Sequence, residues 1–114
     1  MDFTNGDHAS TADTTPDKGG ANAGFRPHEL LESALATCMN MTLRMVAERQ
    51  QIRLAGASVT VVLDRSDPSH PVFEYRVQID DVSDEERVAL LSAIVTCPVR
   101  RTLSAPLAFR LATE

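Results

Sequence analysis

The sequence has no tryptophan, one tyrosine and only two cysteines among its 114 residues. With so few aromatic rings, the chain offers little surface on which nucleic-acid bases could stack. A net charge of −5 provides no basic surface to attract phosphates. Two cysteines are also too few for a disulfide scaffold. We therefore expect no nucleic-acid partner and no fold held together by disulfides.

The chain also lacks a long apolar run and a start typical of a secretion signal. No apolar stretch reaches the roughly 18 residues that a membrane-spanning helix needs. The first residues, Met1 to Asp7, do not form a basic and then apolar leader. We therefore expect a cytoplasmic protein with no membrane partner, folded as a single domain over residues 1–114. In a reducing compartment, a bond between the two cysteines would be transient and chemical.

The first half of the chain predicts a loop-rich segment followed by one long helix. Residues 1–24 carry almost no large apolar side chains, so at most a short edge strand is expected there, around Asp7–Thr14. Pro27 suits the first turn of a helix that continues to about Gln50. Apolar steps of three and four residues predict a largely buried helix with this inward face: Leu31, Ala34, Leu35, Cys38, Met41, Thr42 and Met45.

The second half predicts strands and two shorter helices. Residues 58–64 and 72–79 are β-branched or alternating runs on either side of a turn-forming cluster, which indicates an antiparallel strand pair. A further alternating run, Leu107–Ala112, predicts a last strand. Together with the long helix, these strands indicate an α+β domain.

Helix-start signals place the two shorter helices. Ser83 and Glu86 form a capping box, so a helix should begin at Asp84 and end near Cys97. Its inward residues are expected to be Val88, Leu91 and Val95. Pro98 is suited to open a new helical turn, with Cys97 as its cap.

The two cysteines, Cys38 and Cys97, are the strongest candidates for a functional centre. A free cysteine taken alone is more often a small buried hydrophobe than a reactive group. At a helix N-terminus with Arg100 and Arg101 one turn away, however, Cys97 is expected to favour the thiolate. Cys38 lies in the middle of a helix, so an activating cation must come from elsewhere in the fold.

The histidines do not indicate a metal or protease site. His8, His28 and His70 have no ligand spacing among themselves or with the cysteines, so no metal or resident cofactor is expected. His28 lies ten residues before Cys38, about 80° away around a helix, which makes a cysteine protease a weak interpretation.

Two cysteine motifs give the chain a resemblance to a known family. Residues 25–38, Phe-Arg-Pro-His-Glu-Leu-Leu-Glu-Ser-Ala-Leu-Ala-Thr-Cys, followed by 41–44, resemble the central-helix signature of the OsmC/Ohr family. This family contains osmotically inducible and organic hydroperoxide resistance proteins. Residues 96–99 with Thr102 and Leu103 resemble its second cysteine motif, and the likeness covers about residues 20–112. It implies an α+β fold in intertwined homodimers, with a long buried central helix packed on an antiparallel sheet.

The resemblance also implies a chemistry for the cysteines. Members of the family reduce organic hydroperoxides or hydrogen peroxide. By analogy, Cys38 would be the peroxidatic thiolate that becomes a sulfenic acid, and Cys97 the resolving thiol that closes a disulfide. An external dithiol would then restore both thiols, and no bound cofactor would be needed.

The chain departs from the family pattern at the activating cation. The family uses an arginine from an N-terminal strand, held by a glutamate, whereas no arginine precedes Arg26 here, so the N-terminus looks shortened. The organic hydroperoxide branch has its glutamate directly after the proline, where this chain has His28, then Glu29. Arg26 is the best candidate for the cation, reaching Cys38 across the interface or through a fold-back of the loop, and Glu29 is the candidate glutamate. Glu29 is half a turn from the Cys38 direction, so it would act across the dimer or beyond a kink. The alternative is a non-catalytic, ligand-binding or redox-sensing homodimer that lacks the activating arginine.

Overall fold

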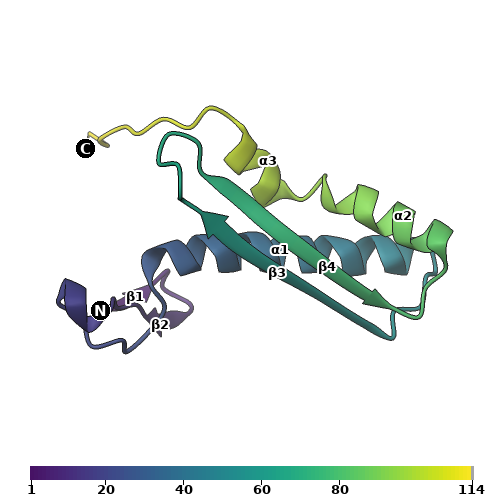
Figure 1. Ribbon diagram of the computed structural model, residues 1–114, viewed down its shortest axis with the longest axis horizontal. Helices are drawn as coiled ribbons and strands as arrows, with labels where there is room; N and C mark the ends of the chain where they lie inside the picture. Colours follow the sequence, from purple (N-terminus) through teal and green to yellow (C-terminus); the bar gives the residue numbers. More distant parts are fainter. Residues whose placement is uncertain (114) are drawn as a thin grey trace. The chain divides into compact units, whose positions relative to one another are not determined.

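The computed structural model describes residues 1–113 as an α+β fold (Figure 1). Its elements are, in order, β1 (Asp2–Thr4), β2 (Ala9–Thr11), the 3-10 helix η1 (Pro16–Lys18), α1 (Pro27–Arg49), β3 (Gly56–Asp64), β4 (Val72–Asp80), α2 (Asp84–Ile94) and α3 (Pro98–Ser104). They form two compact units. The first unit comprises residues 1–34 and 61–74, and the second comprises residues 35–60 and the chain from Tyr75 onward.

The N-terminal segment is more ordered than its composition predicts. β1 and β2 form an antiparallel hairpin in which Phe3 pairs with Ser10. The side-chain oxygen of Asn5 accepts the backbone N–H groups of Asp7 and His8 in the hairpin turn, where Gly6 has a φ of +99°. A left-handed φ of this kind suits glycine because it has no Cβ. Polar contacts therefore hold a segment for which at most one short edge strand was expected.

The long helix α1 begins and ends close to its predicted bounds. At its start, the Arg26 N–H donates to Glu29 Oε1 at 2.8 Å, so one half of a capping box is present. At its end, Gln51 adopts a left-handed φ of +56° and the Ile52 N–H donates to the Ala47 carbonyl at 2.8 Å. This closes the helix in a Schellman-like turn. Among the described residues, no helix has the length and apolar character needed to span a membrane.

The inward face of α1 differs from the expected one. Its buried side chains are spaced four residues apart: Leu35, Met39, Leu43 and Ala47. Leu31, Met41 and Met45 were expected to face inward but are 43%, 63% and 53% exposed, and Ala34, also expected to face inward, is exposed. The reason is that apolar residues occupy most of the helix circumference, so periodicity alone does not select the stripe that a single chain covers.

β3 and β4 form the predicted two-stranded sheet and run antiparallel in Figure 1. Alternate side chains are shielded along β4, where Ile79 is the most deeply buried residue. In the turn between the strands, Asp67 Oδ1 accepts the Ser69 N–H at 3.0 Å. This contact is typical of an Asx-turn, and the turn cluster in the sequence predicted it correctly.

Helix α2 begins as predicted but turns a different face inward. Ser83 and Glu86 form both hydrogen bonds of the capping box. Leu90 and Ile94 are fully buried, whereas Val88, Leu91 and Val95 are 64%, 40% and 46% exposed. Arg87 explains the difference, because its guanidinium donates to the Ile79 carbonyl at 2.8 Å and so holds the Arg87, Leu90 and Ile94 side of the helix toward β4. A search for apolar periodicity overlooks an arginine on an inward face.

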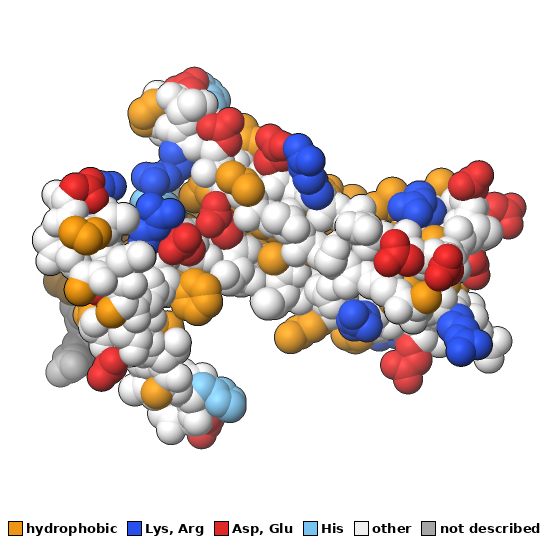
Figure 2. Space-filling view, turned by 60° about the horizontal axis from the view of Figure 1, so that its bottom comes forward, with side chains coloured by type: hydrophobic (Ala, Val, Ile, Leu, Met, Phe, Trp, Pro, Cys, Tyr) orange, Lys and Arg blue, Asp and Glu red, His pale blue; other side chains and the backbone are white. Residues whose placement is uncertain are grey.

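The predicted last strand is absent from the chain as described. Residues 105–113 form no helix or strand. Leu107, Phe109 and Leu111 are 58%, 98% and 92% exposed, and Figure 2 shows hydrophobic side chains exposed among charged ones on one face of the molecule. A strand exists only when a neighbouring strand completes its hydrogen bonds. The alternation is real, but within the described chain no strand pairs with these residues.

Candidate active site at the two cysteines

Two helices position the cysteines, and both cysteines belong to the second unit. Cys38 lies in the middle of α1, one residue before the buried Met39. Cys97 lies at the junction of α2 and α3, where it is the N-cap of α3 and Pro98 is the first residue of the helix. Its backbone N–H donates to the Ile94 carbonyl at 3.0 Å, so the end of α2 fixes it as well. The predicted capping position is therefore confirmed.

The thiols of Cys38 and Cys97 lie close together, since a side-chain hydrogen bond with Cys38 is one of the causes that raise the pKa of Cys97. Both are free thiols. They differ in access, because Cys38 is half-buried whereas Cys97 has no exposed surface. The structure thus brings together two thiols that are far apart in the sequence, one open to reagents and one covered.

The environment of Cys97 raises the pKa of its thiol. Burial is the largest cause and the hydrogen bond with Cys38 the next, while the backbone N–H groups of Arg100 and Val99 lower the pKa by less. The prediction that Cys97 favours the thiolate is therefore wrong. α3 has only seven residues, and the Cys97 side chain does not cap it with a hydrogen bond. Arg101 is exposed to water. Desolvation of a buried thiolate outweighs these weak contributions.

This arrangement suits dithiol–disulfide chemistry. The raised pKa keeps the proton on Cys97, so its S–H can donate to the sulfur of Cys38. Two sulfurs in hydrogen-bond contact need only a small approach to form a bond. Cys38, the more accessible thiol, would react first with a reagent from solution, and the buried Cys97 would be close enough to react with it afterwards.

Arg26 and Glu29 form a separate pair in the first unit. Arg26 Nε lies 3.3 Å from Glu29 Oε1, and the two side chains are 52% and 39% exposed. The backbone N–H of Arg26, and then its guanidinium, lower the pKa of the Glu29 carboxyl. The four residues singled out in the sequence are therefore present as two pairs, Cys38 with Cys97 and Arg26 with Glu29.

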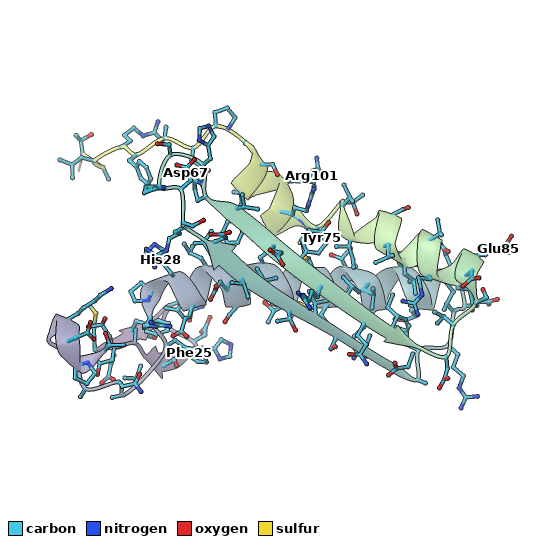
Figure 3. All side chains as sticks on the ribbon, in the orientation of Figure 1. Phe25, His28, Asp67, Tyr75, Glu85 and Arg101 are labelled. Atoms are coloured by element: carbon cyan, nitrogen blue, oxygen red, sulfur yellow. The ribbon has the colours of Figure 1, made fainter. Side chains whose placement is uncertain are left out.

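All three histidines belong to the first unit. His70 Nδ1 lies 3.4 Å from Asp67 Oδ2 in the exposed β3–β4 turn. His28 lies in the first turn of α1, with Phe25 just before the helix (Figure 3). Within residues 1–113, no group of three histidine, cysteine, aspartate or glutamate side chains has the geometry of a metal site.

Comparison with known proteins places the chain in context. A family model described as OsmC-like protein matches residues 19–112. Among solved structures, an organic hydroperoxide resistance protein OsmC from Legionella pneumophila is 23% identical with a TM-score of 0.65, covering 89% of this chain and 77% of its own. An organic hydroperoxide resistance protein from Elizabethkingia anophelis is 22% identical with a TM-score of 0.65, covering 88% and 76%.

An OsmC-like protein from Mycoplasma pneumoniae is also similar, at 22% identity and a TM-score of 0.65, covering 85% of this chain and 73% of its own. No curated protein sequence matches the chain. At these identities the structural matches establish the fold, and the family model establishes the family.

Proposed function

Because the chain belongs to the OsmC-like protein family, we propose that it reduces organic hydroperoxides or hydrogen peroxide, with Cys38 as the peroxidatic thiol and Cys97 as the resolving thiol. The observation that carries this proposal is the hydrogen bond between an accessible thiol and a buried one. Two structurally similar proteins are described as organic hydroperoxide resistance proteins, which supports the substrate class. The proposed role is defence against oxidative stress.

In the first step, the Cys38 thiolate attacks one oxygen of the peroxide. A sulfur–oxygen bond forms, the O–O bond breaks, and the other oxygen leaves as an alcohol or water after taking a proton. Cys38 becomes a sulfenic acid, oxidised by two electrons, and the peroxide is reduced by two. Exposure favours Cys38 as the attacking thiol, because a hydroperoxide cannot reach a sulfur that has no exposed surface.

In the second step, Cys97 attacks the sulfenic sulfur of Cys38. A disulfide forms, and the hydroxide released from Cys38 leaves as water after taking the Cys97 proton. Cys97 must lose its proton to attack, and that proton leaves with the hydroxide as water. Before oxidation, the raised pKa of Cys97 avoids two adjacent thiolates and leaves Cys38 as the thiol that ionises. An external dithiol would then donate two electrons by thiol–disulfide exchange and restore both thiols.

Arg26 is the proposed activating cation, with Glu29 as its positioning partner. A cation beside Cys38 would stabilise both the thiolate and the negative charge on the departing oxygen. Arg26 is the only arginine before α1, and its ion pair with Glu29 restricts its guanidinium. The proposal requires that Arg26 serve a Cys38 thiol across a dimer or through a rearranged loop.

A homodimer is the proposed assembly. One chain leaves apolar side chains exposed on α1, on α2 and on the C-terminal segment: Met41, Met45, Val88, Leu91, Val95, Leu107, Phe109 and Leu111. Single exposed apolar residues are ordinary, but methionine and valine more than half exposed on one face of a helix indicate a surface that another chain covers. A second copy would also offer a strand edge to residues 107–112.

Hydroperoxide consumption in the presence of a dithiol tests the proposed function. The unmodified protein should consume cumene hydroperoxide or hydrogen peroxide catalytically, and Cys38→Ser should reduce the rate to that of buffer. Cys97→Ser should consume about one equivalent quickly and then slow down, because the resolving step is lost. Full activity in Cys38→Ser would overturn the mechanism. Oxidation of the unmodified protein once, without turnover, would instead favour a redox sensor.

A further inference from the structure

A polar cavity of about 310 Å³ lies in the first unit, beside the start of α1. Segments far apart in the sequence contribute charged side chains to its lining. η1 provides Lys18, the first turns of α1 provide His28, and the chain just after β3 provides Arg65. Arg26, Glu29 and Glu32 also line it. Figure 3 shows His28 on this turn of the helix.

The two carboxylates of the cavity are already engaged by local donors. Glu29 accepts the Arg26 N–H at 2.8 Å and pairs with the Arg26 guanidinium. Glu32 Oε2 accepts the Leu63 N–H at 2.6 Å. Each carboxylate therefore has a structural partner of its own, and Arg26 is already paired with Glu29.

Lys18 and Arg65 differ from Arg26 in this respect. Neither forms an ion pair within residues 1–113. Asp17 precedes Lys18 in the chain, and its carboxyl pKa is lowered mainly by the Thr15 hydroxyl and less by the charges of Lys18 and Arg26. Lys18 is the chain's single lysine. Two uncommitted cations thus border one cavity in a protein whose net charge is −5.

We propose that this cavity binds a small oxyanion, a carboxylate or phosphate group, between Lys18 and Arg65. Arginine matches the planar or tetrahedral oxygens of such groups, and lysine adds a mobile point charge. The N-terminal end of a 23-residue helix adds partial positive charge at the same place. A volume of about 310 Å³ is enough to accommodate a small organic acid or a phosphate.

The cavity shares Arg26 and Glu29 with the proposed peroxidase, but Lys18 and Arg65, on which the binding proposal rests, have no role in that chemistry. None of its lining residues is a cysteine, and it lies wholly within the first unit, whereas Cys38 and Cys97 belong to the second. Loss of peroxidase activity in Cys38→Ser would therefore not affect this proposal, and loss of anion binding on exchange of Lys18 and Arg65 would not affect the proposed peroxidase.

Titration of the ¹⁵N-labelled protein with inorganic phosphate, and separately with succinate, tests the site at constant ionic strength. We expect saturable shifts of backbone signals at Lys18, His28 and Arg65, with chloride causing none. Tighter binding of phosphate would assign a phosphate site, and tighter binding of succinate a carboxylate site. Shifts that do not saturate with either probe would overturn the proposal.

Matched variants separate a site from general charge. The double variant Lys18→Gln with Arg65→Gln should bind roughly tenfold or more weakly, because two charge-assisted contacts are lost. The charge-preserving Arg65→Lys should retain part of the affinity. Arg53→Gln removes one positive charge at an exposed loop position outside the cavity and should bind like the unmodified protein. Equal weakening by Arg53→Gln, or normal binding by the double variant with an unchanged thermal unfolding curve, would refute the site.

Discussion

At the scale of single residues, burial rather than local charge distinguishes the two thiols. Cys97 is covered and keeps its proton, while Cys38 is half-buried and can meet a reagent. A helix N-terminus and two nearby arginines had predicted instead that Cys97 would be the thiol that readily loses its proton. Burial has the larger effect on the pKa of Cys97 because a buried thiolate loses its hydration. A seven-residue helix and a solvated arginine stabilise that thiolate only weakly.

The order of reaction leads to a prediction for Cys97→Ser. Treated with one equivalent of hydroperoxide, this variant should accumulate a sulfenic acid at Cys38, because no thiol remains to displace hydroxide from it. Trapping with dimedone and peptide mass spectrometry should find the adduct on the Cys38 peptide. In the unmodified protein the same treatment should give a Cys38–Cys97 disulfide and little adduct. A disulfide between two chains through Cys38 alone would contradict the assigned resolving role.

Arg26→Ala tests the activating cation. If the guanidinium stabilises the Cys38 thiolate, its removal should move the pH profile of Cys38 alkylation toward higher pH and slow peroxide attack severalfold. The measurement is the rate of iodoacetamide modification against pH, made in a Cys97→Ser background so that one thiol reports. Arg44→Ala, which removes another arginine from α1, is the control. An unchanged profile in Arg26→Ala would move the role to another residue.

At the scale of elements, Asp13 organises the N-terminal segment. Its carboxylate accepts the backbone N–H groups of Thr14, Ala21 and Ala23 at 2.8, 2.9 and 3.1 Å. These hydrogen bonds, the Thr14 bond first, lower the pKa of Asp13. One acidic side chain thus links the chain just after β2 to the loop that leads into α1.

Asp13→Ala should loosen this segment without unfolding α1. Hydrogen exchange at the Ala21 and Ala23 amides should become severalfold faster, because both lose their acceptor. The pH dependence follows from the lowered pKa. The stabilisation is present above the ordinary pKa of an aspartate and is lost as the pH falls through the lowered pKa of the folded state. Unchanged exchange at these amides in Asp13→Ala would refute this role. So would a ratio of exchange rates between the variant and the unmodified protein that stays the same at low pH, where the Asp13 contribution should be lost.

The elements show how far the sequence could predict the fold. The starts of α1, α2 and α3 were correct because proline and the Ser83–Glu86 capping box act through local chemistry. The inward faces were wrong because they depend on neighbours. Met39 is buried in place of Met41, and Leu90 in place of Leu91, once Arg87 binds the β4 backbone.

The site was predictable to the same extent. Motif resemblance located Cys38, Cys97, Arg26 and Glu29, but the contact between the two thiols depends on the packing of α1 against the α2–α3 junction. The raised pKa of Cys97 depends on burial that no local pattern records. Lys18 and Arg65 carry no motif, and only the folded chain brings them to one cavity.

At the scale of the whole molecule, the C-terminal segment links the fold to the proposed dimer. Its sequence alternates like a strand, yet residues 105–113 form none, and Phe109 is 98% exposed. An alternating apolar segment gains from a sheet edge, because pairing satisfies its backbone groups and covers every second side chain. A second copy of the chain would supply such an edge, and residues 107–112 would then become the strand that the sequence predicts.

We therefore expect a dimer at micromolar concentration, weakened by changes in this segment. Phe109→Asp should shift the protein toward monomer because it places a charge where an apolar side chain would be covered, and Ala108→Pro should do so by removing a backbone donor. Arg110→Ser is the matched control, since alternation places residue 110 on the opposite face from Phe109. Light scattering coupled to size exclusion measures the mass, and circular dichroism confirms that each variant keeps its helices. A monomeric unmodified protein would contradict the dimer, whereas equal dissociation by Arg110→Ser would show that the segment does not pair as a strand.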